Sequence, residues 1–359
     1  MITVLFCGGG TGGHVFPIKS LIDYILNNKE INGQIKEIFW SGEVDSLEAK
    51  VASSISGEKF RFLPIRSGKL RRDISLRSII LNFFDIFSLI FGFFQCLFIL
   101  KVYKVDVIFC KGGYVALPMV FAGWVFRKKI IVHESDTVPG LANKISAKFA
   151  SKIFCGFPGI LHKSIYVGQI LSDEILNFQS IDMNLNTSTP KTRVMVMGGS
   201  QGARTLYQAL EKAISQNQVI KDKFHFTIIL GTQNTELKEQ FSKLDNVDTL
   251  DFVSQPQVGF LINNSDIAIS RGGATSLAEI KAFGLPIIII PLPYTGGNHQ
   301  YYNALHYQKE YKDLLVEQND NLEDNLTKGL LQHTNFRMES HLTPSFNQTK
   351  KIIVSSILE

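Results

Sequence analysis

The hydrophobic positions of this chain fall into short continuous runs, such as Ile2–Cys7, Val105–Cys110 and Ile287–Ile290. Runs of this length without polar alternation predict strands that are buried on both faces of a parallel sheet. Further strands are expected at Lys36–Ser41, Phe60–Pro64, Ile130–His133, Ile153–Cys155, Arg193–Met197, Phe226–Leu230, Val247–Phe252 and Asp266–Ser270. Segments with helical spacing separate these runs, so the chain alternates strand and helix as an α/β protein does.

Glycine-rich turns directly follow four of the predicted strands. They are Gly8–Gly13, Gly112-Gly113, Gly198-Gly199 and Gly272-Gly273. A strand, a glycine turn and a helix form the start of a βαβ unit, which binds ligands at the carboxyl ends of its strands. The pattern occurs in both halves of the chain, and 359 residues exceed what one hydrophobic core usually supports. We therefore predict two Rossmann-like parallel-sheet domains that face each other across a cleft.

The boundary between the two domains is expected between residues 165 and 166. Residues 1–165 hold the first predicted sheet, which Ile153–Cys155 closes, and residues 166–359 hold the second. The segment 177–191 is polar and rich in turn-forming residues, so it is predicted to be a loop close to this junction. The final helix can pack back on the first domain.

Charge and cysteine content narrow the possible functions. The net charge of +5 is modest, and no basic run indicates nucleic-acid binding. The four cysteines lack Cys-x-x-Cys spacing, which excludes the common zinc and redox motifs. No Asp-x-Asp string is present, so no motif for a metal–diphosphate bridge is visible. We expect neither a metal ion nor a cofactor. Ile2–Cys7 is too short for the apolar region of a signal peptide.

Ile79–Leu100 is the most apolar segment, with one charge in 22 residues. It is long enough to span a bilayer, but the strand Val105–Cys110 follows at once, so we reject a span. Its small and polar residues form one narrow helical stripe: Asn82, Asp85, Ser88, Gly92 and Gln95. Two interpretations remain, a buried core helix or a peripheral membrane site beside basic residues. The basic residues are Lys69, Arg71, Arg72 and Arg77.

The stretch Asp266–Ala304 carries most of the candidate chemistry. Its glycine turn leaves backbone N–H groups and a helix N-terminus at the edge of the sheet, which suits an anionic ligand. Glu279 lies in that helix, away from the apolar stripe that includes Leu277 and Ile280. Glu279 is therefore either a solvated glutamate or a carboxylate that accepts hydrogen bonds from sugar hydroxyls, as acidic residues do for ribose.

Several separated motifs resemble the MurG family of membrane-associated N-acetylglucosaminyltransferases. They are Gly8–His14, Lys111–Tyr114, His133-Glu134, Gly140-Leu141 with Asn143-Lys144, Gly198–Arg204 and Ser270–Ala304, and together they cover nearly the whole chain. The resemblance implies the GT-B architecture. It also implies inverting transfer of N-acetylglucosamine from UDP-N-acetylglucosamine to the C4 hydroxyl of the muramyl sugar of lipid I, giving lipid II. A peripheral position on the anionic cytoplasmic face of the cell membrane follows from the lipid-linked acceptor.

The resemblance assigns expected roles to individual residues. Those expected to bind the donor are Thr11, Gly12, Gly13, Ser200, Val253, Ala274, Thr275, Glu279 and Gln300. Ser200 would lie near the diphosphate, Glu279 on the ribose, and Val253 where backbone groups meet the uracil. An inverting transfer needs a general base for the acceptor hydroxyl, and His14 is our candidate with Glu134 as its rival.

The chain departs from the family pattern at two places. Asp136 stands where the family usually has Asn, and it is kept as a substrate-binding candidate. The family string Gly-Asn-Pro-Val-Arg reads Gly168-Gln169-Ile170-Leu171-Ser172 here. The family's arginine contact is therefore missing, and Lys163 or another cation would have to replace it.

Three other functions remain open from the sequence. A UDP-sugar epimerase could use a similar two-domain frame, but it would need no lipid acceptor and would leave the apolar helix unused. A dinucleotide-dependent oxidoreductase fits the G-x-G-x-x-G spacing of the first turn. However, no acidic residue follows either glycine turn about 20 residues later at a strand end, as such folds require. A membrane-bound nucleotide-sugar sensor without catalysis is the third alternative.

Overall fold

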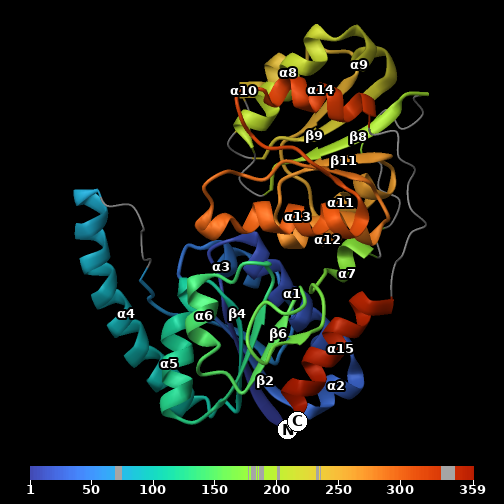
Figure 1. Cartoon of the computed structure of the whole chain (residues 1–359). Helices are drawn as coiled ribbons and strands as arrows, with labels where there is room; N and C mark the ends of the chain where they lie inside the picture. The colour runs from blue at the N-terminus through green and yellow to red at the C-terminus, as the bar shows by residue number, and fades with distance from the viewer. Residues whose placement is uncertain are drawn as a thin grey trace. The chain divides into compact units, whose positions relative to one another are not determined.

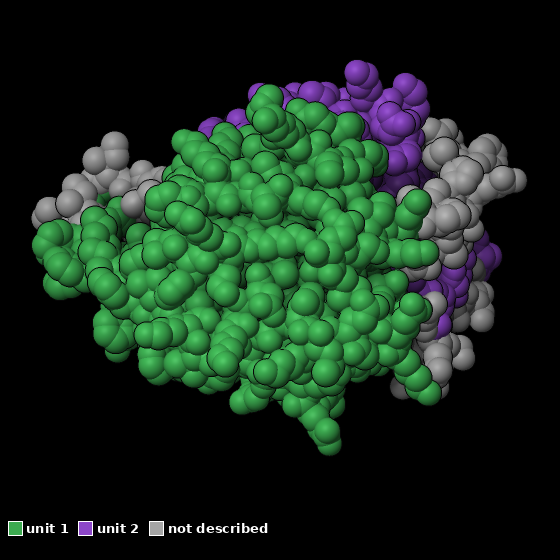
Figure 2. All heavy atoms as spheres, turned by 90° about the horizontal axis from the view of Figure 1, so that it is seen from below, with its two compact units in different colours: residues 1–170, 345–359 green, residues 171–344 purple. Residues whose placement is uncertain are grey.

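The computed structural model of the chain describes residues 1–68, 75–176, 178, 183, 185, 190–199, 203–231, 234, 236–332 and 344–359. Lys69, Arg71, Arg72 and Ser200 lie outside these residues, as does most of the predicted junction loop. The chain divides into two compact units, which Figure 2 colours separately. Unit 1 comprises residues 1–170 and 345–359, and unit 2 comprises residues 171–344.

Unit 1 is built around a seven-stranded parallel sheet with the order β3-β2-β1-β4-β5-β6-β7 (Figure 1). Its strands are β1 Ile2–Gly8, β2 Ile35–Gly42, β3 Phe60–Pro64, β4 Val107–Gly112, β5 Lys129–Glu134, β6 Lys152–Cys155 and β7 Ile165–Tyr166. The prediction that Ile153–Cys155 closes this sheet is wrong, because the two-residue strand β7 pairs with β6 at the edge.

Helices cover both faces of this sheet. They are α1 Gly12–Asn27, α2 Lys29–Gln34, α3 Leu47–Ala52, α4 Leu76–Val102, η1 Tyr114–Ala116, α5 Leu117–Val125, α6 Leu141–Ser146 and, at the end of the chain, α15 Pro344–Leu358. Alternate residues of β1 point to opposite faces, as in any strand. Val4 and Phe6 belong to the core cluster that includes residues of α1 and α15, whereas Leu5 and Cys7 join the cluster of α4 and α5.

Unit 2 contains a six-stranded parallel sheet with the order β10-β9-β8-β11-β12-β13. Its strands are β8 Thr192–Met197, β9 Phe224–Ile229, β10 Val247–Leu250, β11 Ile267–Ser270, β12 Ile287–Ile289 and β13 Leu314–Leu315. Its helices are α7 Asp173–Leu176, α8 Arg204–Gln216, α9 Gln218–Lys223, α10 Glu236–Phe241, α11 Gln255–Asn263, α12 Ala274–Ala282, η2 Gly296–Asn298, α13 His299–Tyr311 and α14 Leu322–Gln332.

The four glycine turns follow the strands at which each sheet reverses its order. In unit 1 these neighbouring strands are β1 and β4, and in unit 2 they are β8 and β11. A reversal point leaves a crevice at the carboxyl ends of the two strands, where open α/β sheets bind their ligands. The predicted architecture of two parallel-sheet domains is confirmed, and each domain carries its own reversal point.

Helix α4 packs on unit 1 mainly through its carboxyl-terminal part, where Cys96, Ile99 and Leu100 enter the core. Only 22 % of its most apolar stretch is buried, and its amino-terminal half extends away from the sheet (Figure 1). The exposed aromatic residues are Phe83, Phe84, Phe87, Phe91, Phe94 and Phe98. By length and composition α4 could cross a membrane, but it leads directly into β4 as a crossover. The interpretation as a buried core helix is wrong.

The narrow polar stripe of α4 faces the segment that follows β3. Gln95 Oε1 accepts a hydrogen bond from the Arg66 N–H at 2.8 Å. A Cβ at Gly92 would lie 1.9 Å from Arg66 O, and one at Gly68 would lie 2.1 Å from Asp85 O. The stripe is therefore a close packing contact, which leaves the phenylalanines on the outer sides of the helix.

Candidate active site

The first glycine turn, Gly8–Gly13, ends in helix α1, so His14 lies in the first turn of that helix. Thr11 is the N-cap residue, and its side chain makes no capping hydrogen bond; Gly12 and Gly13 open the helix. Nδ1 of His14 lies 3.1 Å from Gly9 O and 3.2 Å from Thr11 Oγ1. Because a carbonyl oxygen only accepts, Nδ1 carries the hydrogen and Nε2 holds the lone pair, which is the tautomer a base at Nε2 requires.

The second glycine turn, Gly112-Gly113, packs directly against the first. Both glycines have positive φ, +115° and +82°. A Cβ at Gly113 would lie 2.6 Å from Gly9 O, so a side chain here would collide with the carbonyl that contacts His14. The Tyr114 hydroxyl that follows donates to Glu43 at 3.3 Å. The two turns are thus packed against each other at one edge of unit 1.

Glu134, the alternative candidate for the base, is 3 % exposed, and the loop that follows it donates hydrogen bonds to its carboxylate. Its Oε1 accepts from the Asp136 N–H at 2.9 Å, and its Oε2 accepts from the Gly140 N–H at 3.1 Å and from Asn143 Nδ2 at 2.9 Å. Burial, followed by the charge of half-buried Asp136, raises the pKa of Glu134. With both oxygens engaged, Glu134 is better placed to shape the loop than to take a proton. The geometry favours His14.

Lys111 is a buried cation that is not among the predicted site residues. It is 1 % exposed, and its Nζ donates to Ser135 Oγ at 2.5 Å. Burial lowers the pKa of Lys111, whereas the charges of Glu134 and Asp136 oppose that shift. Lys163 lies at the amino end of β7, which begins at Ile165. Lys111 rather than Lys163 therefore supplies positive charge at the carboxyl ends of β4 and β5.

Three buried polar atoms near this loop have no hydrogen-bond partner within the described ranges. They are His133 Nδ1, Asn143 Oδ1 and Gln169 Oε1. His133 Nε2 donates to Gly168 O at 3.1 Å, so its Nδ1 is an acceptor. Burial, with the nearby Lys111 charge, keeps the pKa of His133 well below its usual value. The cluster therefore offers acceptors for donors that a bound molecule or water would bring.

In unit 2, the fourth glycine turn, Gly272-Gly273, is packed against the start of α13. A Cβ at Gly272 would lie 2.3 Å from Gln300 O, and Asn303 Nδ2 donates to Gly272 O at 2.9 Å. Gln300 Oε1 accepts from the Leu292 N–H at 2.9 Å. The backbone of Gln300 thus lies against the turn, and the Leu292 N–H holds its side chain.

Glu279 is buried in α12 of the same unit, at 6 % exposure. No residue in the described part of the chain donates a hydrogen bond to its carboxylate, and burial alone raises its pKa to about 8. The N-cap residue of α12, Gly273, provides no side-chain cap; Ala274 and Thr275 follow it, buried and half-buried. The interpretation as a solvated glutamate is wrong. A buried acceptor without a donor is costly unless a ligand supplies one.

Arg271 and Val253 are two further residues of unit 2. Arg271 directly follows β11, and its Nη1 donates to Ile290 O at 3.1 Å. Burial lowers the pKa of Arg271 to about 10, so it remains a cation at neutral pH. Val253 is half-buried between β10 and α11, beside the capping box formed by Ser254 and Gln257. Arg271 belongs to the motif Ser270–Ala304 but is not among the residues predicted to bind the donor.

The buried carboxyl of Glu279 gives unit 2 a specific pH dependence. Its pKa is about 8 in the folded chain against 4.5 for the ordinary group, so the folded state keeps a proton that the unfolded state releases. The stabilising effect of that proton is complete below about pH 4.5 and is lost as the pH rises to about 8. Relative to wild type, Glu279→Gln should therefore gain unfolding free energy at up to about 1.4 kcal/mol per pH unit in this window. Denaturant unfolding of both proteins across this range measures it, and a difference independent of pH would contradict it.

Models of two protein-family domains match this chain. Residues 4–155 match the glycosyltransferase family 28 N-terminal domain, and residues 193–355 match the glycosyltransferase family 28 C-terminal domain. A curated relative from Borrelia turicatae is 31 % identical over 99 % of this chain and 96 % of its own length. It is a UDP-N-acetylglucosamine–N-acetylmuramyl-(pentapeptide) pyrophosphoryl-undecaprenol N-acetylglucosamine transferase. The enzyme of the same name from Clostridium botulinum is 30 % identical over 98 % of this chain and 95 % of its own length.

Solved structures show the same fold. MurG of Acinetobacter baumannii superposes with a TM-score of 0.72 at 19 % identity, covering 99 % of both chains. The UDP-GlcNAc 2-epimerase of Neisseria meningitidis gives 0.62 at 16 % identity, covering 99 % of this chain and all of its own. At these identities both similarities show the fold alone. The similarity to the epimerase therefore does not indicate that this chain catalyses epimerisation.

The fold, the glycine turns and the matched domains define a two-domain nucleotide-sugar glycosyltransferase of the GT-B type. The chain belongs to glycosyltransferase family 28. The predicted enzyme class and the resemblance to the MurG family are thereby confirmed.

Proposed function

We propose that this chain transfers N-acetylglucosamine from UDP-N-acetylglucosamine to the C4 hydroxyl of the muramyl sugar of lipid I, with inversion, to give lipid II. The names of the full-length relatives support this substrate pair. The observation that carries the donor side is Glu279, a buried carboxylate without a described partner in the helix that follows the fourth glycine turn. The hydroxyls of a ribose would supply the missing donors, and the uncapped start of α12 would face the diphosphate.

His14 acts as the general base in this proposal. Nε2 removes the proton of the acceptor hydroxyl as its oxygen bonds to the anomeric carbon, and the bond from that carbon to the diphosphate oxygen breaks. The electron pair of that bond leaves with UDP, whose added charge is stabilised by backbone N–H groups at helix N-termini. The Nδ1–H bond to Gly9 O stabilises the imidazolium that His14 becomes.

Release of UDP with and without acceptor tests the proposed function. With a lipid-linked muramyl acceptor, the wild-type chain should form UDP at a rate that depends on acceptor concentration. UDP formed equally well without acceptor would instead indicate an epimerase or a hydrolase. No UDP under either condition, with the donor bound, would indicate a sensor. The last two results both contradict transfer.

We expect turnover to persist in excess EDTA. The sequence contains no Asp-x-Asp string to bridge a metal ion to the diphosphate, and helix N-termini can stabilise the leaving group instead. Initial rates before and after chelation, each with and without added Mg²⁺, provide the measurement. Loss of turnover in EDTA that Mg²⁺ restores would show that the reaction depends on a metal ion.

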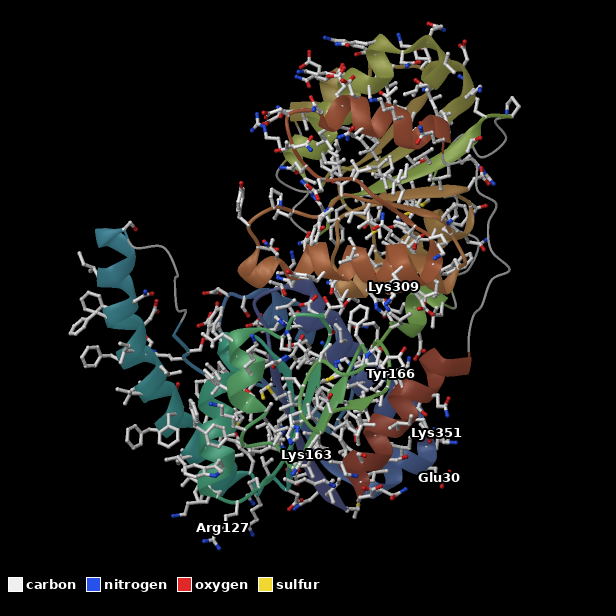
Figure 3. All side chains as sticks on the ribbon, in the orientation of Figure 1. Glu30, Arg127, Lys163, Tyr166, Lys309 and Lys351 are labelled. Atoms are coloured by element: carbon white, nitrogen blue, oxygen red, sulfur yellow. The ribbon has the colours of Figure 1, made fainter. Side chains whose placement is uncertain are left out.

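An exposed apolar surface on unit 1 supports a peripheral membrane position, which we propose to be on the cytoplasmic face. It is formed by Phe83, Phe84, Phe87, Phe91, Phe94 and Phe98 of α4 together with Trp124 and Phe126 at the end of α5, and we call it the α4–α5 surface. Side chains project outward along α4 in Figure 3, and Arg127 is labelled just beyond α5. Apolar side chains beside cations suit an anionic lipid surface.

Substitutions on the α4–α5 surface should release the chain from membranes. Phe94→Asp and Phe98→Asp place charges where apolar side chains would enter the lipid interface, so each should weaken binding to vesicles of phosphatidylcholine and phosphatidylserine. Val219→Asp, at an exposed apolar residue of α9 in unit 2, is the matched control. Co-sedimentation measures the bound fraction. Equal binding by all three variants and wild type would remove this surface from the proposal.

A further inference from the structure

Glu48 is a buried carboxylate beneath the first glycine turn. It lies in the six-residue helix α3 and is 0 % exposed. Its Oε2 accepts from the Gly10 N–H at 3.1 Å, and its Oε1 accepts from the Glu43 N–H at 3.3 Å. A fully buried carboxylate is costly unless donors satisfy it, so these two backbone N–H groups are the reason that it is tolerated there.

The neighbouring glycines are shaped to admit this side chain. A Cβ at Gly9 would lie 2.4 Å from Glu48 Oε1 and Cδ, and a Cβ at Gly42 would lie 2.4 Å from Glu48 Cγ. Any other residue at either position would have to displace the Glu48 side chain. Glu48 therefore packs beneath the first glycine turn and accepts a hydrogen bond from it, and it is not a surface residue of a short helix.

One peptide group connects Glu48 to His14. The N–H of the Gly9–Gly10 peptide points to Glu48 Oε2, and the C=O of the same peptide lies 3.1 Å from His14 Nδ1. In a planar trans peptide these two groups point in opposite directions, so fixing one aims the other. A carboxylate on the N–H also polarises the peptide and makes its carbonyl a better acceptor.

We infer that Glu48 is a positioning residue that sets the tautomer of His14 through the Gly9–Gly10 peptide. The inference deepens the proposed function, because it rests on His14 as the base for its effect on turnover. The tautomer itself does not depend on that role. The bond to Gly9 O keeps hydrogen on Nδ1 and leaves Nε2 able to accept a proton.

Both residues of this peptide are glycines, and Gly10 has a φ of +86°. Glycine on both sides lets the peptide plane turn over with little steric resistance. A turned peptide would aim its N–H at Nδ1, and the imidazole would then hold its hydrogen on Nε2, where it cannot act as a base. Glu48 opposes this alternative because its carboxylate accepts only the N–H.

The ¹⁵N resonances of the His14 imidazole report its tautomer directly. In the full-length wild-type chain, at a pH where the ring is neutral, we expect the Nδ1–H form. Glu48→Met keeps the side-chain length but removes both acceptors, so it should raise the Nε2–H fraction. Glu48→Gln keeps one acceptor oxygen and should retain more of the Nδ1–H form than Glu48→Met does. Asp106→Asn is the matched control, because Asp106 accepts the Thr3 N–H at 2.8 Å at the far end of β1.

Kinetics separate this inference from the proposed function. Glu48→Met should lower kcat by about 10-fold or more with the KM for UDP-N-acetylglucosamine little changed, because the wrong tautomer removes the base. Gly9→Ala should act in the same direction by displacing the carboxylate, and it serves if Glu48→Met does not fold. In the Glu48→Ala background, Gly9→Ala should add little further loss, since the space is then free.

An unchanged His14 tautomer in both folded variants, Glu48→Met and Gly9→Ala, would overturn the inference whatever the rates show. An altered tautomer with a lower kcat supports both the inference and the base role. An altered tautomer with an unchanged kcat supports the positioning by Glu48 and contradicts the role of His14 as base.

Discussion

Replacement of His14 by alanine should lower kcat by about 10²–10⁴-fold while the affinity for UDP stays nearly constant. A general base acts in the transition state, so its removal changes turnover rather than ground-state binding of the donor. The contact of Nδ1 with Gly9 O orients the ring for this role. Steady-state rates with a lipid-linked acceptor, together with calorimetry of UDP binding, measure the two quantities separately.

Two further variants serve as a control and as a test of the alternative base. His162→Ala removes an exposed histidine from the same unit and should leave kcat unchanged. Glu134→Gln keeps the shape of a side chain whose oxygens hold the loop from Asp136 to Gly140, so we expect it to affect kcat less than His14→Ala does. If Glu134→Gln gives the large loss and His14→Ala does not, the base is Glu134.

Replacement of Glu279 by alanine should weaken UDP binding by about 1.5–3 kcal/mol, which is about 10- to 150-fold in Kd. The buried carboxylate would accept hydrogen bonds from the ribose, and alanine leaves those hydroxyls without an acceptor. Calorimetry with UDP measures the change. Glu239→Ala, at an exposed glutamate of α10 in the same unit, should bind UDP as wild type does. An unchanged affinity for Glu279→Ala would remove this residue from the donor site.

Most of the fold was predictable because its signals are local. Continuous apolar runs such as Ile287–Ile290 and the glycine turns that follow four strands specify parallel sheets with reversal points. The two-residue strands β7 and β13 were missed because such short segments show no periodicity, and only their pairing with β6 and β12 defines them. Edge strands of this kind depend on the sheet already being in place.

The candidate site was predictable where a motif and a strand end coincide. His14 lies in the first turn of the helix that follows the first glycine turn, Glu134 is the last residue of β5, and Gln300 lies in the first turn of α13. Glu48 was not noticed, and Lys111 was part of a motif but not a predicted site residue, because the importance of both comes from burial that the sequence does not reveal. Glu48 lies in a short helix. Its burial is evident only in the structure, where a Cβ at Gly9 or Gly42 would collide with its side chain.

Helix α4 is a second case in which the sequence did not reveal burial. Its composition allowed either a core helix or a membrane-facing one, since periodicity alone does not identify what packs on each face. The structure decides between them through Gly92 and Gln95, which contact the segment after β3, while the phenylalanines stay exposed. The sequence thus predicted the hydropathy of the helix, but not which of its faces are packed against the domain and which are exposed.

The configuration of the newly formed linkage tests the proposed transfer most directly. UDP-N-acetylglucosamine labelled with ¹³C at the anomeric carbon, incubated with the chain and a lipid-linked muramyl acceptor, gives a product whose linkage can be read by NMR. A single in-line displacement on the α-configured donor predicts a β-linked sugar on the C4 hydroxyl of the acceptor. An α-linked product, or free N-acetylhexosamine with no lipid-linked disaccharide, would contradict inverting transfer.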